Sequence, residues 1–279
     1  MIDESVANAN NRERSCGDEK SLIISLVSGR EAPFLLLIFV LTVVTFSILR
    51  AMKGKIPTIR ELPAMVAIKE AVGRCVELGT PILYAGGNSL AGLASPRGPG
   101  HMAGLGILGE VATQSARLKA ETIALVSWPE QLPIADAIVK NAYDGQGYPE
   151  GYKPDNVEFT SDRSFTHCIR MMSLVYNRKP ASCVLAGSYS GESLLMCETA
   201  SSTGAIVIGG TETANQMPYF AAVCDYLLIG PEIFAAEAAA TGQPVLLGSL
   251  LGDDIVKSVS IFLLFAGLLL TVIFGVKIG

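Results

Sequence analysis

Residues 182–230 decide the fold and read SCVLAGSYSGESLLMCETASSTGAIVIGGTETANQMPYFAAVCDYLLIG. The segment holds three short apolar stretches, at 182–186, 205–208 and 226–229, separated by helix-like sequence. Strands that are apolar throughout and alternate with helices are typical of a parallel sheet covered on both faces. The segment therefore predicts an α/β domain.

The same alternation continues outward on both sides of this segment. Upstream we expect strands at 81–85, 122–126 and 157–160, and downstream a last strand at 244–247. Helical spacing of apolar residues predicts connecting helices at 61–78, 101–118, 133–142, 162–177, 191–201, 214–223 and 231–240. Seven strands in this order predict a doubly wound, mostly parallel sheet that is Rossmann-like in the broad sense.

Two uncharged apolar runs bracket the predicted domain. They read PFLLLIFVLTVVTFSIL at 33–49 and SVSIFLLFAGLLLTVIFGV at 258–276. Runs of this length approach what a helix needs to cross the roughly 30 Å hydrocarbon core of a bilayer. The fold class we expect is therefore an α/β domain inserted between two transmembrane helices.

The runs also predict how the chain is divided. We expect a polar tail with a short interfacial helix at 21–31, a transmembrane helix, the α/β domain and a second transmembrane helix, over 1–32, 33–50, 51–254 and 255–277. The first run follows an acidic segment and no small-residue cleavage site adjoins it, which favours a retained anchor over a signal peptide.

Basic residues near the runs predict the orientation. Four bases follow the first run and two precede it at similar distance: Arg50, Lys53, Lys55 and Arg60 against Lys20 and Arg30. Because bases beside a span favour the cytoplasmic side, we expect a cytoplasmic domain with both termini outside. The expected location is the cell membrane, with lipid as one partner.

Composition excludes some classes of function. The formal net charge is −5, and no basic stripe is interleaved with aromatic residues, so we expect no nucleic-acid partner. None of the six cysteines forms a C-x-x-C pair, which argues against a zinc ribbon or a thiol redox motif. We interpret the cysteines as buried free thiols in a reducing compartment.

A literal G-x-G-x-x-G match occurs at Gly104, Gly106 and Gly109, and Glu130 follows where a ribose-binding acid would lie. The match falls inside a predicted helix, whereas the dinucleotide fingerprint begins at the end of a strand. We therefore favour close helix packing over dinucleotide binding.

Glycine marks five of the predicted strand ends, at Gly86-Gly87, Gly187, Gly209-Gly210, Gly230 and Gly248. In a doubly wound sheet the ligand crevice lies beyond these ends. The loop 86–100, GGNSLAGLASPRGPG, adds backbone N–H groups and Arg97, a combination suited to an anion. The alternatives are ordinary turn chemistry and a surface loop without a ligand.

Polar residues gather at the same predicted edge in the second half of the chain. The candidate ligand-binding residues are Gly86, Gly87, Arg97, Tyr189, Ser190, Glu192, Thr211, Glu212 and Gln216. Helix capping is the simpler explanation for each polar residue alone. Neither His101 nor His167 lies in a recognisable catalytic setting, and Tyr189 stands where a G-x-S-x-G elbow needs serine. No catalytic residue, metal ligand or cofactor is predicted.

Two longer segments resemble a known family. They are ELPAMVAIKEAVGRCVELGTPILYAGG, from residue 61, and the segment from AGSYSGES to LLGSLLGDD, at 186–254. Over about 60–254 the chain resembles an uncharacterised family of membrane-anchored domains from archaea and bacteria. That family usually carries a second acid beside the position of Glu232, where this chain has Pro231. The resemblance implies no activity, so no catalytic residue is transferred.

These observations leave alternatives for function. We expect a scaffold, an assembly subunit or a small-ligand sensor that forms homo-oligomers or joins other membrane-complex subunits. The alternative is a membrane-bound enzyme that acts on a nucleotide or small anionic metabolite in the strand-end crevice. Transport is a third possibility; it would require oligomerisation, because two spans cannot form a pore alone, and neither run carries a charge to mark an ion path.

Overall fold

The structure is a computed structural model that describes residues 31–54, 60–89 and 92–274. Residues 1–30 of the expected polar tail, which include all of the expected interfacial helix at 21–31 except Glu31, lie outside these residues. The last residues of the expected second span, from 275 on, lie outside them too.

A six-stranded sheet forms the centre of the domain, and all its strands are parallel. The strand order is β3-β2-β1-β4-β5-β6, which is the order of the doubly wound dinucleotide-binding fold. The strands are β1 (Ile82–Gly86), β2 (Thr122–Val126), β3 (Val157–Phe159), β4 (Ser182–Ala186), β5 (Ile206–Thr211) and β6 (Tyr226–Ile229). The predicted α/β class is confirmed.

The seventh expected strand, at 244–247, is wrong. Pro244 begins α10 (Pro244–Phe274), and Leu247 is buried within that helix. A short apolar run cannot be assigned to strand or helix by periodicity alone, and proline suits the first turn of a helix. Gly248 is therefore a helical residue and not a strand end, and the expected boundary at 254/255 falls inside one continuous helix.

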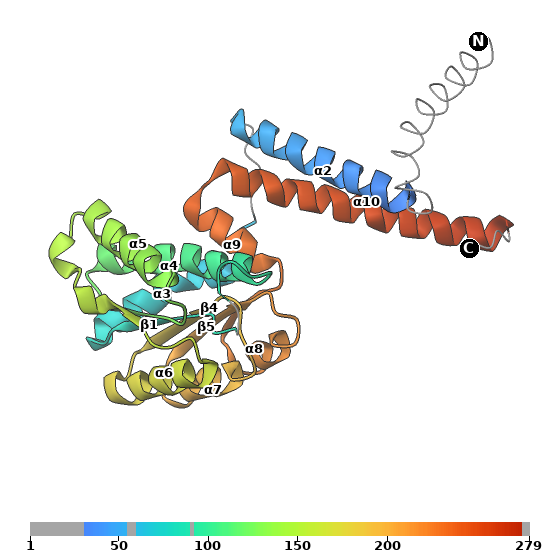
Figure 1. Ribbon diagram of the computed structural model, residues 1–279. Coiled ribbons are helices and arrows are strands. Elements are labelled where there is room, and N and C mark those ends of the chain that lie inside the picture. Colours follow the sequence, from blue (N-terminus) through green and yellow to red (C-terminus); the bar gives the residue numbers. More distant parts are fainter. Residues whose placement is uncertain (1–30, 55–59, 90–91, 275–279) are drawn as a thin grey trace, which may run out of the picture.

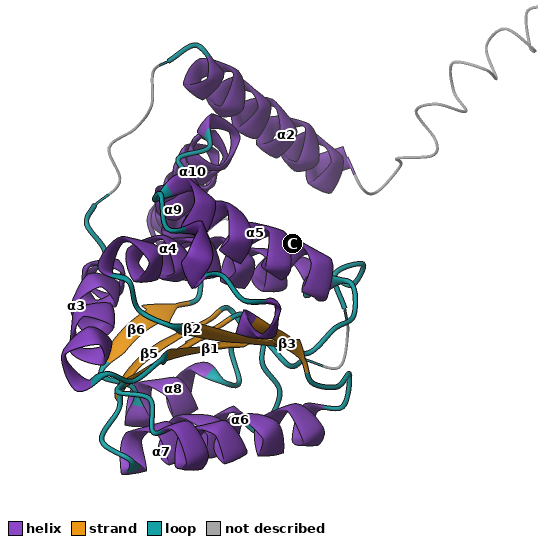
Figure 2. Cartoon of the chain, turned by 90° about the vertical axis from the view of Figure 1, so that its left-hand side faces the viewer, coloured by secondary structure: helices purple, strands orange, loops and turns teal. Residues whose placement is uncertain are grey.

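Helices cover both faces of the sheet, as Figure 2 shows. One face packs against α3 (Pro63–Leu78), α4 (Gly98–Leu118), α5 (Gln131–Gly145) and α9 (Glu232–Thr241). The other packs against α6 (Ser164–Arg178), α7 (Ser193–Ser202) and α8 (Met217–Val223). Two short 3-10 helices, η1 (Pro149–Gly151) and η2 (Pro154–Asn156), join α5 to β3.

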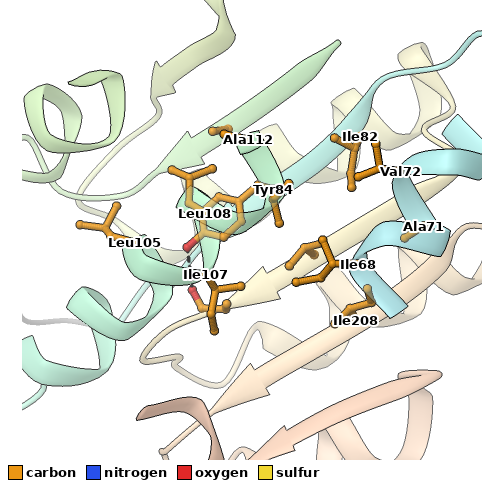
Figure 3. Close-up of a cluster of buried hydrophobic side chains, with 14 of the residues drawn as sticks. Ile68, Ala71, Val72, Ile82, Tyr84, Leu105, Ile107, Leu108, Ala112 and Ile208 are labelled. Atoms are coloured by element: carbon orange, nitrogen blue, oxygen red, sulfur yellow. Dashed lines mark hydrogen bonds between the residues drawn. The ribbon is translucent and has the colours of Figure 1, made fainter. Parts of the chain in front are cut away.

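Strand β1 illustrates how the sequence builds two cores. Ile82 and Tyr84 belong to the cluster beneath α3 and α4, drawn in Figure 3, whereas Leu83 and Ala85 belong to the opposite cluster. All four side chains are at most 1% exposed. Because successive strand residues point to opposite faces, a continuously apolar strand is the expected result of burial on both sides.

A two-helix hairpin joins the domain, formed by α2 (Glu31–Met52) and α10, which lie side by side and antiparallel in Figure 1. Gly248 and Gly252 face α2 at the contact. A Cβ on Gly248 would lie 2.7 Å from the Ile48 Cα, and one on Gly252 would lie 3.0 Å from the Val44 Cα. Glycines four residues apart allow such close approach of two helix backbones.

Helix α2 has the length and composition of a membrane span over Phe34–Met52, with a mean hydropathy of 2.5. Within the part of the chain that the structure describes, it is the one helix that meets this criterion. The first half of α10 carries Asp253, Asp254 and Lys257, and Lys257 forms an ion pair with Asp253.

Candidate functional site

The strand order reverses between β1 and β4, which pair directly. In doubly wound sheets the ligand crevice opens at this switch point, beyond the carboxyl ends of the strands. Here the chain leaves β1 through Gly87, Asn88 and Ser89, and leaves β4 through Gly187 and Ser188. The two departing segments therefore define the candidate site.

The two segments contact each other directly. Ser89 donates a backbone hydrogen bond to the Ser188 carbonyl at 3.0 Å. A Cβ on Gly87 would overlap the Ser188 backbone, and Gly187 has a φ of 141°, which favours glycine. Gly87, a candidate ligand-binding residue, thus lies against the backbone of the chain itself.

Glu212 follows β5, the strand next to β4, and lies at the same edge of the sheet. Its carboxylate lies against Gly100 in the first turn of α4, where a Cβ on the glycine would overlap it. Ser188 Oγ lies within hydrogen-bonding distance of Glu212 Oε1 and, at 2.9 Å, of the Arg97 carbonyl. A hydroxyl has one proton, so Ser188 donates to one of these acceptors at a time.

This position is where an anion binds in related folds. The N-terminus of a helix stabilises negative charge through its exposed N–H groups and its dipole. In the dinucleotide-binding fold the pyrophosphate lies at the N-terminus of the helix that follows the first strand. In this protein that helix is α4, and its first turn is occupied by the chain's own carboxylate.

Asn88 links the switch point to the β3–α6 connection. Its side-chain oxygen accepts a hydrogen bond from the Ser190 backbone at 3.1 Å, and its carbonyl accepts one from Ser164 Oγ at 2.7 Å. Asn88 is 1% exposed. Buried polar groups that are hydrogen-bonded in this way hold loops in one arrangement.

Both histidines lie beside hydroxyl groups. Ser89 Oγ is 2.9 Å from His101 Nε2, and Thr160 Oγ1 is 2.6 Å from His167 Nδ1. Burial lowers the pKa of His167 to about 4, so this imidazole is neutral at pH 7. A hydroxyl beside an imidazole has the chemistry of a nucleophile and its base, yet Ser89 and His101 are at most 2% exposed.

Arg97 and Tyr189, both predicted to bind a ligand, lie in different surroundings. The exposed Arg97 donates from Nη1 to the Tyr189 carbonyl at 3.3 Å, which places its guanidinium at the rim of the switch point. Tyr189 is fully buried, and its hydroxyl donates to the Ala85 carbonyl at 2.6 Å. The Tyr189 ring therefore belongs to the core and not to the rim.

The remaining predicted residues lie in the segments around the starts of α7 and α8. Ser193 Oγ donates to Gln216 Oε1 at 2.8 Å, and the Thr213 backbone donates to Thr211 Oγ1 at 3.2 Å. Glu192 takes the N-cap position of α7 without a side-chain cap bond. A local turn thus accounts for Thr211, whereas Gln216 connects the start of α8 to the start of α7.

The G-x-G-x-x-G match lies inside α4, as the sequence predicted, and packs against other elements. A Cβ on Gly104 would overlap the Ala186 carbonyl, and one on Gly106 would lie 2.7 Å from Glu237 Cγ in α9. Glu130 accepts a hydrogen bond from the Leu93 backbone at 2.9 Å. These contacts support the helix-packing interpretation.

Sequence reasoning missed Asn88, Gly100 and Ser188. Each lies in a segment that had been singled out, but their contacts depend on which strands are neighbours. The signal that could have found Ser188 is its position directly after the glycine that ends a central strand.

An open groove of about 500 Å³ lies between α10 and the domain. Charged side chains line it together with apolar ones, with Arg60 and Glu232 contributed by the domain and Asp253, Asp254 and Lys257 by α10. Arg60 and Glu232 form an ion pair at 3.6 Å. The described residues contain no group of three or more side chains suited to holding a metal ion.

Fold and site together define a class: an α/β domain of dinucleotide-binding topology whose switch point is occupied by its own side chains, carried on a helical hairpin. Residues 25–278 match DUF6754, described as a domain of unknown function, and the chain belongs to that family. The expected resemblance to an uncharacterised family is confirmed. Comparison with curated proteins and with solved structures finds no match.

Proposed function

We propose that this protein is a membrane-anchored α/β domain that serves as a scaffold or assembly subunit of a membrane complex. The observation that carries the proposal is the Glu212 carboxylate against the first turn of α4. Because the chain supplies its own anion at the switch point, the domain keeps the architecture of a nucleotide-binding fold without an open phosphate site there.

The anchoring part of the proposal is a two-span arrangement, with α2 and the apolar half of α10 in the cell membrane and the domain in the cytoplasm. Two features support it. Helix α2 has the length and hydropathy of a span. The antiparallel packing brings the start of α2 and the end of α10 to the same end of the hairpin, away from the domain (Figure 1).

Native mass spectrometry of the full-length protein from mild detergent tests the scaffold role. We expect a defined oligomer, or a complex with other membrane subunits, that carries no nucleotide-sized mass. A monomer that binds a stoichiometric small molecule and turns it over would contradict the proposal. Protease treatment of inverted and right-side-out vesicles tests the orientation, and digestion of the domain in right-side-out vesicles alone would reverse it.

An enzyme acting on a nucleotide or small anionic metabolite is the second candidate. The observation that favours it is the Ser89–His101 pair, together with the exposed Arg97 guanidinium at the rim. Substrate would require Glu212 to leave Gly100. We would compare nucleotide-induced thermal stabilisation of the wild type with that of Glu212→Gln and Arg97→Gln. Stabilisation that Arg97→Gln abolishes would favour this candidate.

A further inference from the structure

The outer face of α6 carries an apolar stripe. Phe165, Ile169 and Tyr176 are 66%, 64% and 57% exposed, and the half-buried Met172 lies between them. Spacings of four, three and four residues place these side chains on one side of a helix. Contiguous exposed apolar surface of this kind often marks an interaction site.

The stripe stays clear of the hairpin, and the neighbouring helix also exposes an apolar side chain. Leu195 of α7, which packs beside α6, is 46% exposed. Figure 2 shows α6 and α7 beneath the sheet, on the side opposite α2, α9 and α10. A partner can therefore cover the stripe while the hairpin is held in a membrane.

The stripe is symmetric about its own midpoint. Phe165 and Tyr176 are equally far from the point between Arg170 and Met171, and so are Ile169 and Met172. In an antiparallel pair of identical helices, Phe165 therefore meets the partner's Tyr176, and Ile169 meets the partner's Met172. A face that matches itself under a two-fold rotation is the requirement for an isologous contact.

Charges at the two ends of α6 follow the same symmetry. The exposed Asp162 lies just before the helix and the exposed Lys179 just after it, again equally far from the midpoint. Antiparallel pairing brings each carboxylate toward the partner's Lys179. Arg170, near the midpoint, is already held by Glu158 through two hydrogen bonds of 2.7 and 2.8 Å, so the stripe carries no unpaired charge at its centre.

We infer that α6 is the dimer interface of this protein and that its occupant is α6 of a second copy, packed antiparallel. The inference rests on the proposed assembly role and identifies α6 as the surface through which two copies assemble. Apolar contact along the stripe provides affinity, and the two Asp162–Lys179 contacts set the antiparallel register.

The first test places a charge in the stripe of the full-length protein in mild detergent. Ile169→Asp should weaken dimerisation at least about tenfold, because a carboxylate would be buried in an apolar contact. Val66→Asp is the matched control, since Val66 is 60% exposed on α3, on the opposite face of the sheet. Native mass spectrometry and light scattering report the mass, and circular dichroism verifies folding.

A charge exchange tests identity of the partner. Asp162→Lys and Lys179→Asp should each weaken the dimer several-fold, and the double variant should restore it, because opposite charges then face each other again. A monomeric wild type, a dimer that Ile169→Asp leaves intact, or a stripe occupied by a different protein would overturn the inference. Catalytic turnover of a small molecule, or absence of the protein from the membrane fraction, would instead count against the proposed function.

Discussion

The carboxylate of Glu212 lies against Gly100, in the first turn of α4, with Ser188 Oγ beside it. The contact joins three elements: Glu212 follows β5, Ser188 follows β4, and Gly100 lies in the first turn of α4. The carboxylate lies near the N-terminus of a long helix that has no side-chain cap of its own, where the helix dipole favours negative charge.

Gly100→Ala should destabilise the protein by about 1–3 kcal/mol, because the new methyl group would overlap the Glu212 carboxylate. The free energy of unfolding, measured by chemical denaturation, verifies this. Gly109→Ala in the same helix is the control. A Cβ there meets only Ile138 Cγ2 at 3.5 Å, so we expect no loss, or a gain of up to about 1 kcal/mol. Equal effects at both positions would contradict the close contact.

Stability should depend on pH through His167. Burial lowers its pKa from 6.5 to about 4 in the folded protein. Between these values the unfolded chain binds a proton that the folded chain does not, so stability falls as pH falls, by up to about 3 kcal/mol for this group. Denaturation at pH 7, 5.5 and 4.5 measures the slope, which should be shallower in His167→Gln. Equal slopes for the wild type and His167→Gln would contradict the assignment of this pH dependence to His167.

The buried thiols should resist alkylation in the folded protein. Burial raises the pKa of Cys168 to about 11, and it also raises the pKa of Cys75 and Cys183. The reactive thiolate is therefore scarce at pH 8. Peptide mapping after iodoacetamide treatment should show these sites unmodified until denaturant is added. Labelling of Cys168 at the same rate with and without denaturant would be inconsistent with its burial.

Gly248→Leu should separate the hairpin helices, because a side chain at this position would overlap the backbone of α2. We expect a lower thermal unfolding midpoint in detergent and faster proteolysis between α2 and the domain. Ser258→Leu, at an exposed position of the same helix, adds the same side chain without that overlap and should behave as wild type. A Gly248→Leu protein as stable as this control would show that the close contact is dispensable.

The sequence predicts the sheet well because most of its strands are apolar and several of them end at glycine. Six of the expected strands occur, and the ends of α3 follow their signals: Pro63 lies in the first turn, and Gly79 ends the helix with a φ of 64°. The segment at 244–247 failed because four apolar residues suit a strand or a helix equally. Only the contact of Leu247 and Gly248 with the rest of the molecule separates the two.

The sequence predicts which edge of the sheet carries the candidate residues, but it does not predict how they contact one another. Glu212 was named as a pocket residue, yet its role depends on Gly100 and Ser188, which come from other strands' connections. Spacing along the chain cannot show that the carboxylate of Glu212 lies against Gly100 in the first turn of α4.

The glycines that bring α10 against α2 also fix their relative height. With Gly252 beside Val44 and Gly248 beside Ile48, the charged turn at Asp253–Lys257 stands level with the middle of the apolar segment of α2. At a rise of about 1.5 Å per residue, the two uncharged runs are staggered by roughly 18 Å along the hairpin. A flat bilayer therefore cannot immerse both runs fully while this packing lasts. The two-span arrangement proposed above thus requires α2 and α10 to slide or separate on insertion, and the glycine contact is what insertion would have to break.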